Sequence, residues 1–96
     1  MGKVDFRLKA VEDLNDISDY TLETWGPEQE VRYLKALDRA LDRLAESPET
    51  GRACDWLREG YRKHLVGRHV VFYRLTAGGI EVVRVLHQSM DFERHL

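Results

Sequence analysis

Three runs of β-branched and aromatic residues, joined by very short turns, dominate the second half of the chain. They cover residues 61–66, 69–75 and 80–87, and Gly67-Arg68 and Gly78-Gly79 separate them. Turns this short connect antiparallel neighbours, because a parallel connection needs a dozen or more residues. The sequence therefore predicts a three-stranded antiparallel unit in which a one-residue change of register would turn every side chain to the other face.

The first half predicts one strand followed by two helices. Residues 3–8 alternate polar and apolar side chains, which is the period of a strand with one buried face. From about Ala10 the apolar positions change to helical spacing, and Gly26-Pro27 should end the first helix and begin the second. The second helix carries four leucines at three- and four-residue spacing, namely Leu34, Leu37, Leu41 and Leu44. This leucine seam is interpreted as the packing surface of an αα-hairpin.

The predicted order is therefore β-α-α-β-β-β, an α+β fold in which an N-terminal strand and a helical hairpin pack on a small, mostly antiparallel sheet. Glu12 and Asp13 are expected in the first turn of the first helix, where they would complement the helix dipole. Ser47-Pro48 should end the second helix, and residues 49–55 should form a polar connector. With 96 residues the chain can bury one core, so residues 1–96 are expected to form a single domain.

Charge is divided unevenly along the chain. Residues 1–50 hold 7 Lys and Arg against 12 Asp and Glu, whereas residues 51–96 hold 8 against 5, for a net charge of −2. A protein that binds RNA over a broad surface is usually basic overall, because phosphate neutralisation supplies most of its non-specific affinity. The chain does not fit that class, but the basic second half is a candidate docking surface.

Other compositional features narrow the class further. No apolar run approaches the roughly 20 residues that a membrane-spanning helix needs, and the N-terminus has no apolar signal core, so a cytoplasmic location without membrane contact is expected. Cys54 is the single cysteine, which excludes an internal disulfide. A metal site would have to use histidines and carboxylates, and we expect neither a metal nor a cofactor.

Short motifs occur in a fixed order along almost the whole chain. They are Ala10-x-x-Asp13-Leu14-x-x-Ile17-x-x-Tyr20, Trp25-Gly26, Gly51-Arg52, Tyr61-Arg62, His69-Val-Val-Phe-Tyr-Arg74, and Arg84-Val-Leu-His-Gln-Ser-Met-Asp91 with a closing His95-Leu96. In order and spacing they resemble the ParE branch of the RelE/ParE superfamily of bacterial toxins, and the block from Arg84 to Asp91 is the most specific part. The resemblance implies the toxin of a type II toxin–antitoxin module.

What the resemblance implies about activity depends on the branch. ParE-like members bind DNA gyrase, here expected at the A subunit, trap its cleavage complex and block replication, and a ParD-like antitoxin neutralises them by direct binding. They need no cofactor, and no sequence-specific DNA binding is expected of the toxin alone. RelE-like members instead cleave mRNA in the ribosome. A third possibility is a non-toxic module that only binds an antitoxin.

Elementary chemistry helps to choose between the branches. Metal-independent RNA cleavage needs a base, an acid and a cation for the developing phosphorane charge, which Arg84, His87 and Arg62 could supply. In a regular strand, however, Arg84 shares its face with Val82 and Leu86 while His87 points the other way. The RelE-like pattern also tends to have a catalytic Tyr or His near the C-terminus and a strongly basic surface for ribosomal RNA, whereas this chain has no tyrosine after Tyr73. We therefore assign no catalytic residue and expect a non-enzymatic protein.

Two sets of binding residues are predicted. The candidates for target binding are Arg84, His87, Met90, Asp91, Arg94, His95 and Leu96. The candidates for antitoxin binding are Trp25, Tyr33, Leu34, Leu37, Arg58, Arg62, Arg68 and Arg74. Structural roles compete with these assignments, because Arg84 could pair with Asp91, His87 could serve as a hydrogen-bonding residue at a strand end, and Trp25 could plug the tip of the hairpin. The sheet face away from the helices is expected to be partly solvated and open to a partner.

Overall fold

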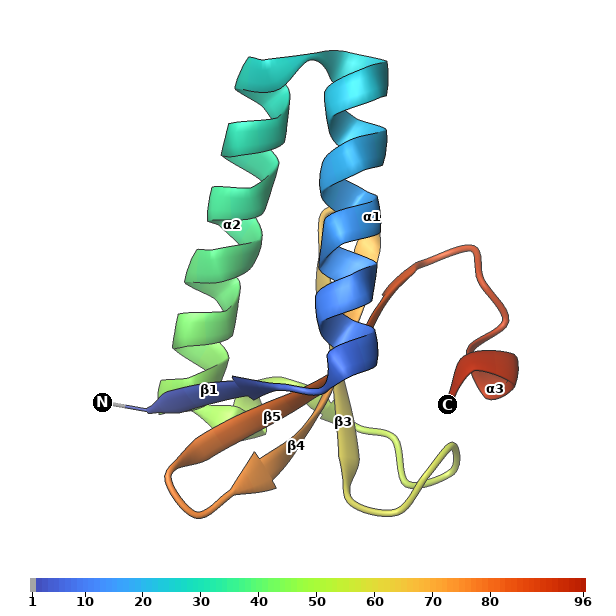
Figure 1. Ribbon diagram of the computed structural model, residues 1–96. Helices are drawn as coiled ribbons and strands as arrows, with labels where there is room; N and C mark the ends of the chain where they lie inside the picture. The colour runs from blue at the N-terminus through green and yellow to red at the C-terminus, as the bar shows by residue number, and fades with distance from the viewer. Residues whose placement is uncertain (1) are drawn as a thin grey trace.

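The computed structural model describes residues 2–96, in which a helical hairpin stands on a five-stranded sheet (Figure 1). In chain order the elements are β1 (Lys3–Phe6), α1 (Leu8–Trp25), α2 (Pro27–Glu46), a 3₁₀ turn (Pro48–Thr50), β2 (Arg52–Ala53), β3 (Tyr61–Val66), β4 (His69–Thr76), β5 (Gly79–His87) and α3 (Phe92–His95). The predicted α+β class and the order of the main elements are confirmed.

The sheet has the strand order β1-β5-β4-β3-β2. Strand β1 is parallel to β5, and all other pairs are antiparallel. The tight turns predicted the two antiparallel pairs β3–β4 and β4–β5. The turn after β4 is one residue earlier than predicted, because Gly79 already pairs with Lys3 and Thr76. A Cβ atom at Gly79 would lie 1.9 Å from the Lys3 carbonyl oxygen, so the pairing of β1 with β5 requires a glycine there.

The polar connector contains structure that the sequence did not predict. Strand β2 extends the sheet by pairing Arg52 with Lys63 of β3. The Tyr73 hydroxyl holds the turn before it, accepting a hydrogen bond from the Gly51 amide at 2.9 Å and donating one to the Pro48 carbonyl. Burial raises the pKa of Tyr73 and keeps this hydroxyl protonated. Because these contacts join residues far apart in the chain, local pattern carries no signal for them.

Helix α1 begins two residues earlier than the apolar spacing suggested. With its start at Leu8, Glu12 and Asp13 lie beyond the first turn, which holds no acidic residue, so their predicted position was wrong. The predicted burial of the first strand was also wrong beyond Val4, since Phe6 is 41% exposed and Leu8 is 75% exposed. The reason is that β1 is an edge strand with a single neighbour and ends before Leu8.

Gly26 makes the hairpin bend, as predicted. Its φ of 91° lies in the region that glycine adopts most readily, and its amide and carbonyl close the last turn of α1 and open α2. Pro27 occupies the first turn of α2, where its missing amide hydrogen costs nothing. The two long helices therefore run antiparallel, side by side above the sheet (Figure 1).

Two hydrophobic clusters lie on opposite faces of the sheet. The cluster under the helices includes the predicted leucine seam, with Leu37, Leu41 and Leu44 almost fully buried and Leu34 packed against them. The second cluster is made of Cys54, Tyr61, Val70, Phe72, Val83 and Leu86. Leu57, Phe92 and Leu96 pack on it, so the chain's own C-terminal segment covers part of the face that was expected to be open.

A bulge in β5 divides its side chains between the two clusters. Tyr73 pairs with Val82 but Phe72 pairs with Arg84, so Val83 is an extra residue in β5. Val82 consequently lies in the cluster under the helices, whereas Val83 and Leu86 lie in the second cluster. The prediction that Arg84 shares a face with both Val82 and Leu86 was therefore wrong, because it assumed a regular strand.

Candidate functional site

Arg84 forms a two-pronged ion pair with a carboxylate of α1. Its Nε and one terminal nitrogen each lie 2.8 Å from an oxygen of Asp13. The two side chains are only 14% and 12% exposed, and the hydrogen bond to Asp13 raises the pKa of Arg84. A carboxylate partner was expected, but the choice of Asp91 was wrong. Asp91 instead caps α3 by accepting a hydrogen bond from the Glu93 amide.

This ion pair joins three elements. Strand β1 pairs with β5 only as far as Val82, so the next part of β5 has no strand on that side. There Asp13 Oδ2 accepts a hydrogen bond from the Val85 amide at 3.0 Å. The other terminal nitrogen of Arg84 donates to the carbonyl of His95 at 2.9 Å. Arg84 therefore holds α3 on the molecule, while Asp13 takes the place of a missing strand.

His87 belongs to a different environment. Its ring meets the ring of His69 edge to face with centroids 5.4 Å apart, and its Nδ1 lies 2.7 Å from the Ser89 hydroxyl. His69 in turn lies 2.6 Å from the hydroxyl of Tyr33, on α2. His87 is therefore tied to the side of the sheet that the helices cover, whereas the Arg84 guanidinium contacts α3.

Arg62 is also separate from these residues. It lies on β3, which β4 separates from β5, and its guanidinium donates to the Gly51 carbonyl at 2.7 Å. Arg84, His87 and Arg62, the set considered for RNA cleavage, therefore each have a separate structural contact and are not brought together around one reacting group. A base and a cation must both lie within hydrogen-bond reach of the substrate to assist such a reaction.

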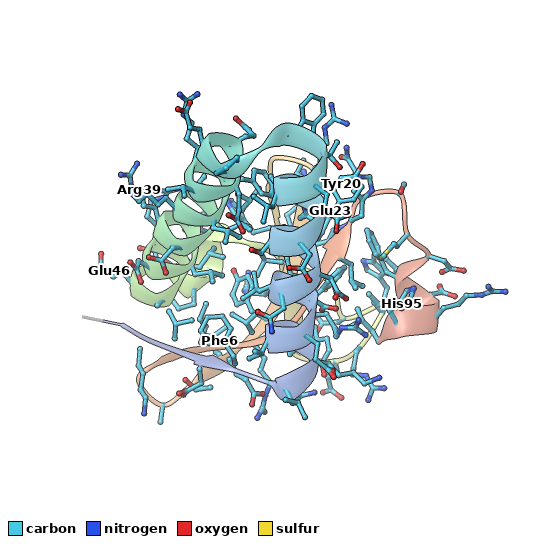
Figure 2. The ribbon with its side chains drawn as sticks, turned by 45° about the horizontal axis from the view of Figure 1, so that its top comes forward. Phe6, Tyr20, Glu23, Arg39, Glu46 and His95 are labelled. Atoms are coloured by element: carbon cyan, nitrogen blue, oxygen red, sulfur yellow. The ribbon has the colours of Figure 1, made fainter. Side chains whose placement is uncertain are left out.

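The C-terminal candidates for target binding are of two kinds. Met90 is 45% exposed and the side chain of Arg94 is 83% exposed, so both are available to a partner. Leu96 instead packs against the second hydrophobic cluster. Figure 2 shows His95 on α3, on the side of the molecule away from α2. The segment is thus a short docked helix that presents only some of its side chains.

The antitoxin candidates are divided in the same way. Trp25 is 66% exposed at the tip of the hairpin, and Arg58 and Arg68 are also exposed. Leu37 is 2% exposed within the core, so its predicted role in binding was wrong. Other members have internal contacts: Leu34 packs on the core, Tyr33 bonds to the turn between β3 and β4, Arg62 bonds to Gly51, and Arg74 bonds to Glu81.

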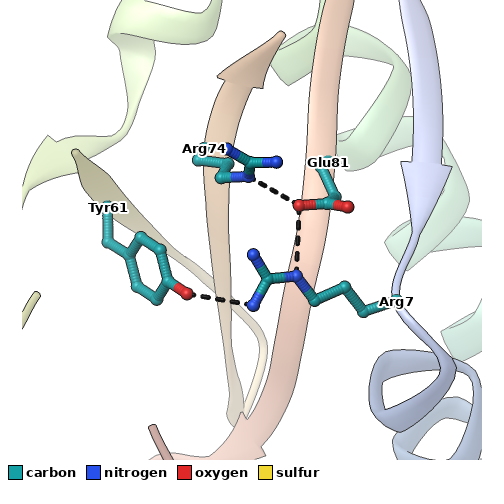
Figure 3. Close-up of polar contacts among 4 residues, drawn as sticks. All are labelled: Arg7, Tyr61, Arg74 and Glu81. Carbon is teal, nitrogen blue, oxygen red and sulfur yellow. Dashed lines mark hydrogen bonds and ion pairs between the residues drawn. The ribbon is translucent and has the colours of Figure 1, made fainter.

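A polar network that the sequence did not indicate lies on the sheet face turned away from the hairpin (Figure 3). Glu81 Oε1 accepts hydrogen bonds from Arg74 at 2.6 Å and from Arg7 at 3.1 Å, and Arg7 also donates to the Tyr61 hydroxyl at 3.1 Å. The Arg74 hydrogen bond and then Arg7 lower the pKa of Glu81, against the effect of burial. Two arginines thus share one carboxylate, which leaves an excess positive charge.

The described residues offer little for metal or redox chemistry. Among residues 2–96, no group of three His, Cys, Asp or Glu side chains is placed to hold a metal ion. Cys54 is buried in the second cluster, and burial raises the pKa of its thiol, which disfavours the reactive thiolate. None of the helices within residues 2–96 is both long and apolar enough to cross a membrane.

Comparisons with known proteins agree in the family that they indicate. The family described as "ParE toxin of type II toxin-antitoxin system, parDE" matches residues 4–92. Toxin ParE1 of Mycobacterium tuberculosis is 52% identical over 84 residues, 86% of each chain. Toxin ParE1 of Caulobacter vibrioides is 43% identical over 88 residues, 92% of this chain and 91% of the relative. A chain from the solved chromosomal ParDE TA system of P. aeruginosa shares the fold, with a TM-score of 0.76 and 19% identity over 91% of this chain and 96% of that chain.

Replacing Asp13 with asparagine should destabilise the protein, because it leaves the mostly buried Arg84 without a counter-charge. We expect Asp13→Asn to lower the free energy of unfolding by about 3 kcal/mol. Asp16→Asn, which neutralises an exposed carboxylate on the same helix, should change it by less than about 0.5 kcal/mol. Urea unfolding followed by circular dichroism measures both values. Equal stability of the two variants would show that the ion pair is not important for folding.

Stability should fall in mild acid because of His69. Burial, with the charge of His87 adding to it, lowers the pKa of His69 below its usual 6.5, so the folded state favours the neutral ring. As the pH falls below about 6.5, the unfolded chain binds a proton first and stability decreases until the pH is below the folded-state pKa. His69→Gln should flatten this part of the stability profile, measured by urea unfolding at a series of pH values. His64→Gln on β3 is the control, and an equal flattening there would contradict the assignment.

Proposed function

Because the chain belongs to the ParE family of toxins from type II toxin–antitoxin systems, we propose that it inhibits DNA gyrase and that a ParD-like antitoxin neutralises it. The main support for this proposal is that the toxin family matches nearly the whole chain, residues 4–92. The toxin binds the A subunit of gyrase and traps the state in which DNA is cleaved, which blocks replication. It acts by binding and needs no cofactor.

The positions of the polar side chains support binding rather than catalysis. Arg84 is bound on two sides by Asp13 and His95, and Arg62 is bound to the Gly51 carbonyl. A cation that stabilises a phosphorane must instead direct its donors toward the substrate. His87, the base considered for this reaction, lies among residues under the helices and accompanies neither arginine. The alternative of a ribosome-dependent mRNA endonuclease therefore receives no support from this arrangement.

The surface proposed for gyrase is the exposed side of α3 and the turn before it. Met90 and Arg94 are solvent-exposed there, whereas Phe92 and Leu96 pack inward on the second cluster. An exposed methionine beside an exposed arginine combines apolar area with charge, as residues at the centre of protein interfaces often do. The Arg84 side chain fixes this surface through the His95 carbonyl.

Substituting both exposed residues should weaken gyrase inhibition. We expect that at least about tenfold more of the double variant Met90→Ala/Arg94→Ala than of the wild type is needed to inhibit supercoiling by purified gyrase. A tenfold change corresponds to a loss of about 1.4 kcal/mol in binding free energy. It should still bind the antitoxin. This pair is preferable to deletion of residues 90–96, which would also remove Phe92 and Leu96 from the second cluster and disturb folding.

Lys35→Ala/Arg39→Ala on the exposed side of α2 provides the control, and it should inhibit gyrase like the wild type. Transcript cleavage in a translation extract, with supercoiling unaffected by the wild type, would replace the proposal with the nuclease alternative. Normal growth after induction without antitoxin would instead identify a non-toxic binding module.

The surface proposed for the antitoxin lies at the tip of the helical hairpin. Leu22, Trp25 and Val31 are 42%, 66% and 49% exposed there, although they are large and apolar. Arg68 lies beside α2, because its amide donates to the Tyr33 hydroxyl at 3.1 Å. An antitoxin segment that is disordered, apolar and acidic would cover the exposed apolar residues and pair with Arg68. Of the residues predicted from sequence, Trp25 and Arg68 remain in this surface.

Truncating Trp25 should separate antitoxin binding from toxicity. We expect Trp25→Ala to weaken binding of the cognate antitoxin at least about tenfold in isothermal titration calorimetry, since large aromatic anchors dominate such interfaces. Gyrase inhibition should be unchanged. Tyr20→Ala removes another exposed aromatic residue from α1, which helix geometry places about 140° around the helix axis from Trp25. An equal loss in the two variants would show that the antitoxin does not select the tip surface.

A further inference from the structure

An open depression lies where the start of α1 meets the sheet face turned away from the hairpin, with a volume of about 460 Å³. Residues of β3, β5 and the end of α3 complete its wall. Among residues 2–96, no aspartate or glutamate lines it, and its basic lining residues are Arg7, Lys9, Arg58, Arg84 and His95. For a chain with a net charge of −2, this is a strong local concentration of cationic groups.

Part of this charge is not neutralised by the chain itself. Arg84 is paired with Asp13, and Arg7 shares Glu81 with Arg74, so those groups together keep one positive charge. Lys9 and Arg58 are exposed and enter no ion pair among residues 2–96. The first turn of α1, which also faces the depression, has no acidic residue to offset its dipole. The depression therefore attracts anions.

Aromatic rings adjoin the charged groups. The guanidinium carbons of Arg7 and Arg58 each lie 6.0 Å from the centre of the Tyr61 ring. Lys63 follows two residues later on β3, on the same side of the strand, and its Nζ lies 5.4 Å from the centre of the Trp56 ring. Trp56 is 65% exposed, so much of this large side chain, with a cation beside it, is open to solvent.

We propose that this depression holds a backbone phosphate of single-stranded nucleic acid and that a neighbouring unpaired base stacks on Trp56. Phosphate accounts for the cationic lining, and the exposed ring accounts for a ligand with flat apolar faces. An acidic peptide would use the cations but would have less use for the ring. The contact is independent of base sequence. This proposal goes beyond gyrase inhibition, because the site could bind nucleic acid in the absence of gyrase.

Fluorescence anisotropy with the purified full-length chain and labelled oligonucleotides of about 12 nucleotides, one of deoxythymidine and one of uridine, tests the site at low salt. Binding of either oligonucleotide supports the proposal, and the comparison shows which sugar is preferred. Lys9→Ala/Arg58→Ala should weaken binding about tenfold and make the dependence on salt shallower by about one unit in a double-logarithmic plot. Trp56→Ala should weaken binding about five- to tenfold with an unchanged salt dependence.

The control is again Lys35→Ala/Arg39→Ala, which removes the same charge from α2 and should bind like the wild type. The residues substituted in the three variants are all exposed, so each variant should fold like the wild type, and thermal melting checks this. The proposal is overturned if the wild type binds neither oligonucleotide at about 50 mM salt. It is also overturned if the two double variants lose affinity equally, or if a polyglutamate peptide binds the depression more tightly than both oligonucleotides. Because gyrase is absent from the assay, these outcomes are distinct from a failure of gyrase inhibition.

Discussion

The ion pair between Arg84 and Asp13 is the contact on which the arrangement of the C-terminal half depends. Asp13 satisfies the Val85 amide where β1 no longer accompanies β5, and Arg84 holds the end of α3 through the His95 carbonyl. A mostly buried guanidinium is tolerated only when its donors are paired, so α1, β5 and α3 must be in place together. This junction helps to hold α3 against the second hydrophobic cluster.

The two faces of the sheet differ in what covers them. The hairpin packs over the first hydrophobic cluster on one face and leaves its own tip exposed, with Trp25 the most exposed large apolar residue there. On the other face, α3 covers only part of the second cluster and leaves a basic depression beside it. The surfaces that we propose for the antitoxin and for gyrase therefore lie on different elements, at the hairpin tip and on α3.

Much of the fold was predictable because it rests on local pattern. The tight turns set the β3-β4-β5 order, Gly26-Pro27 set the hairpin bend, and the leucine spacing identified the core side of α2. The candidate site was less predictable. Asp91 is seven residues from Arg84 and seemed a suitable partner, yet Asp13, 71 positions away, is the residue that the packing of α1 brings to it. Likewise, nothing local indicated that Arg7, Arg74 and Glu81 would meet.

By itself, the sequence determined the order of the main elements and the toxin family, because periodicity, turn chemistry and motif spacing can be read along the chain. Only the tertiary structure decided which face each side chain occupies. Val83 is an extra residue in β5 and changes which side chains along this strand share a face. Helix α1 begins at Leu8 and packs so that Asp13 lies at the edge of β5 that has no neighbouring strand. Both depend on contacts between distant segments. The same long-range packing buries Leu37, docks Leu96 and gathers basic residues from α1, β5, α3 and two loops around one depression.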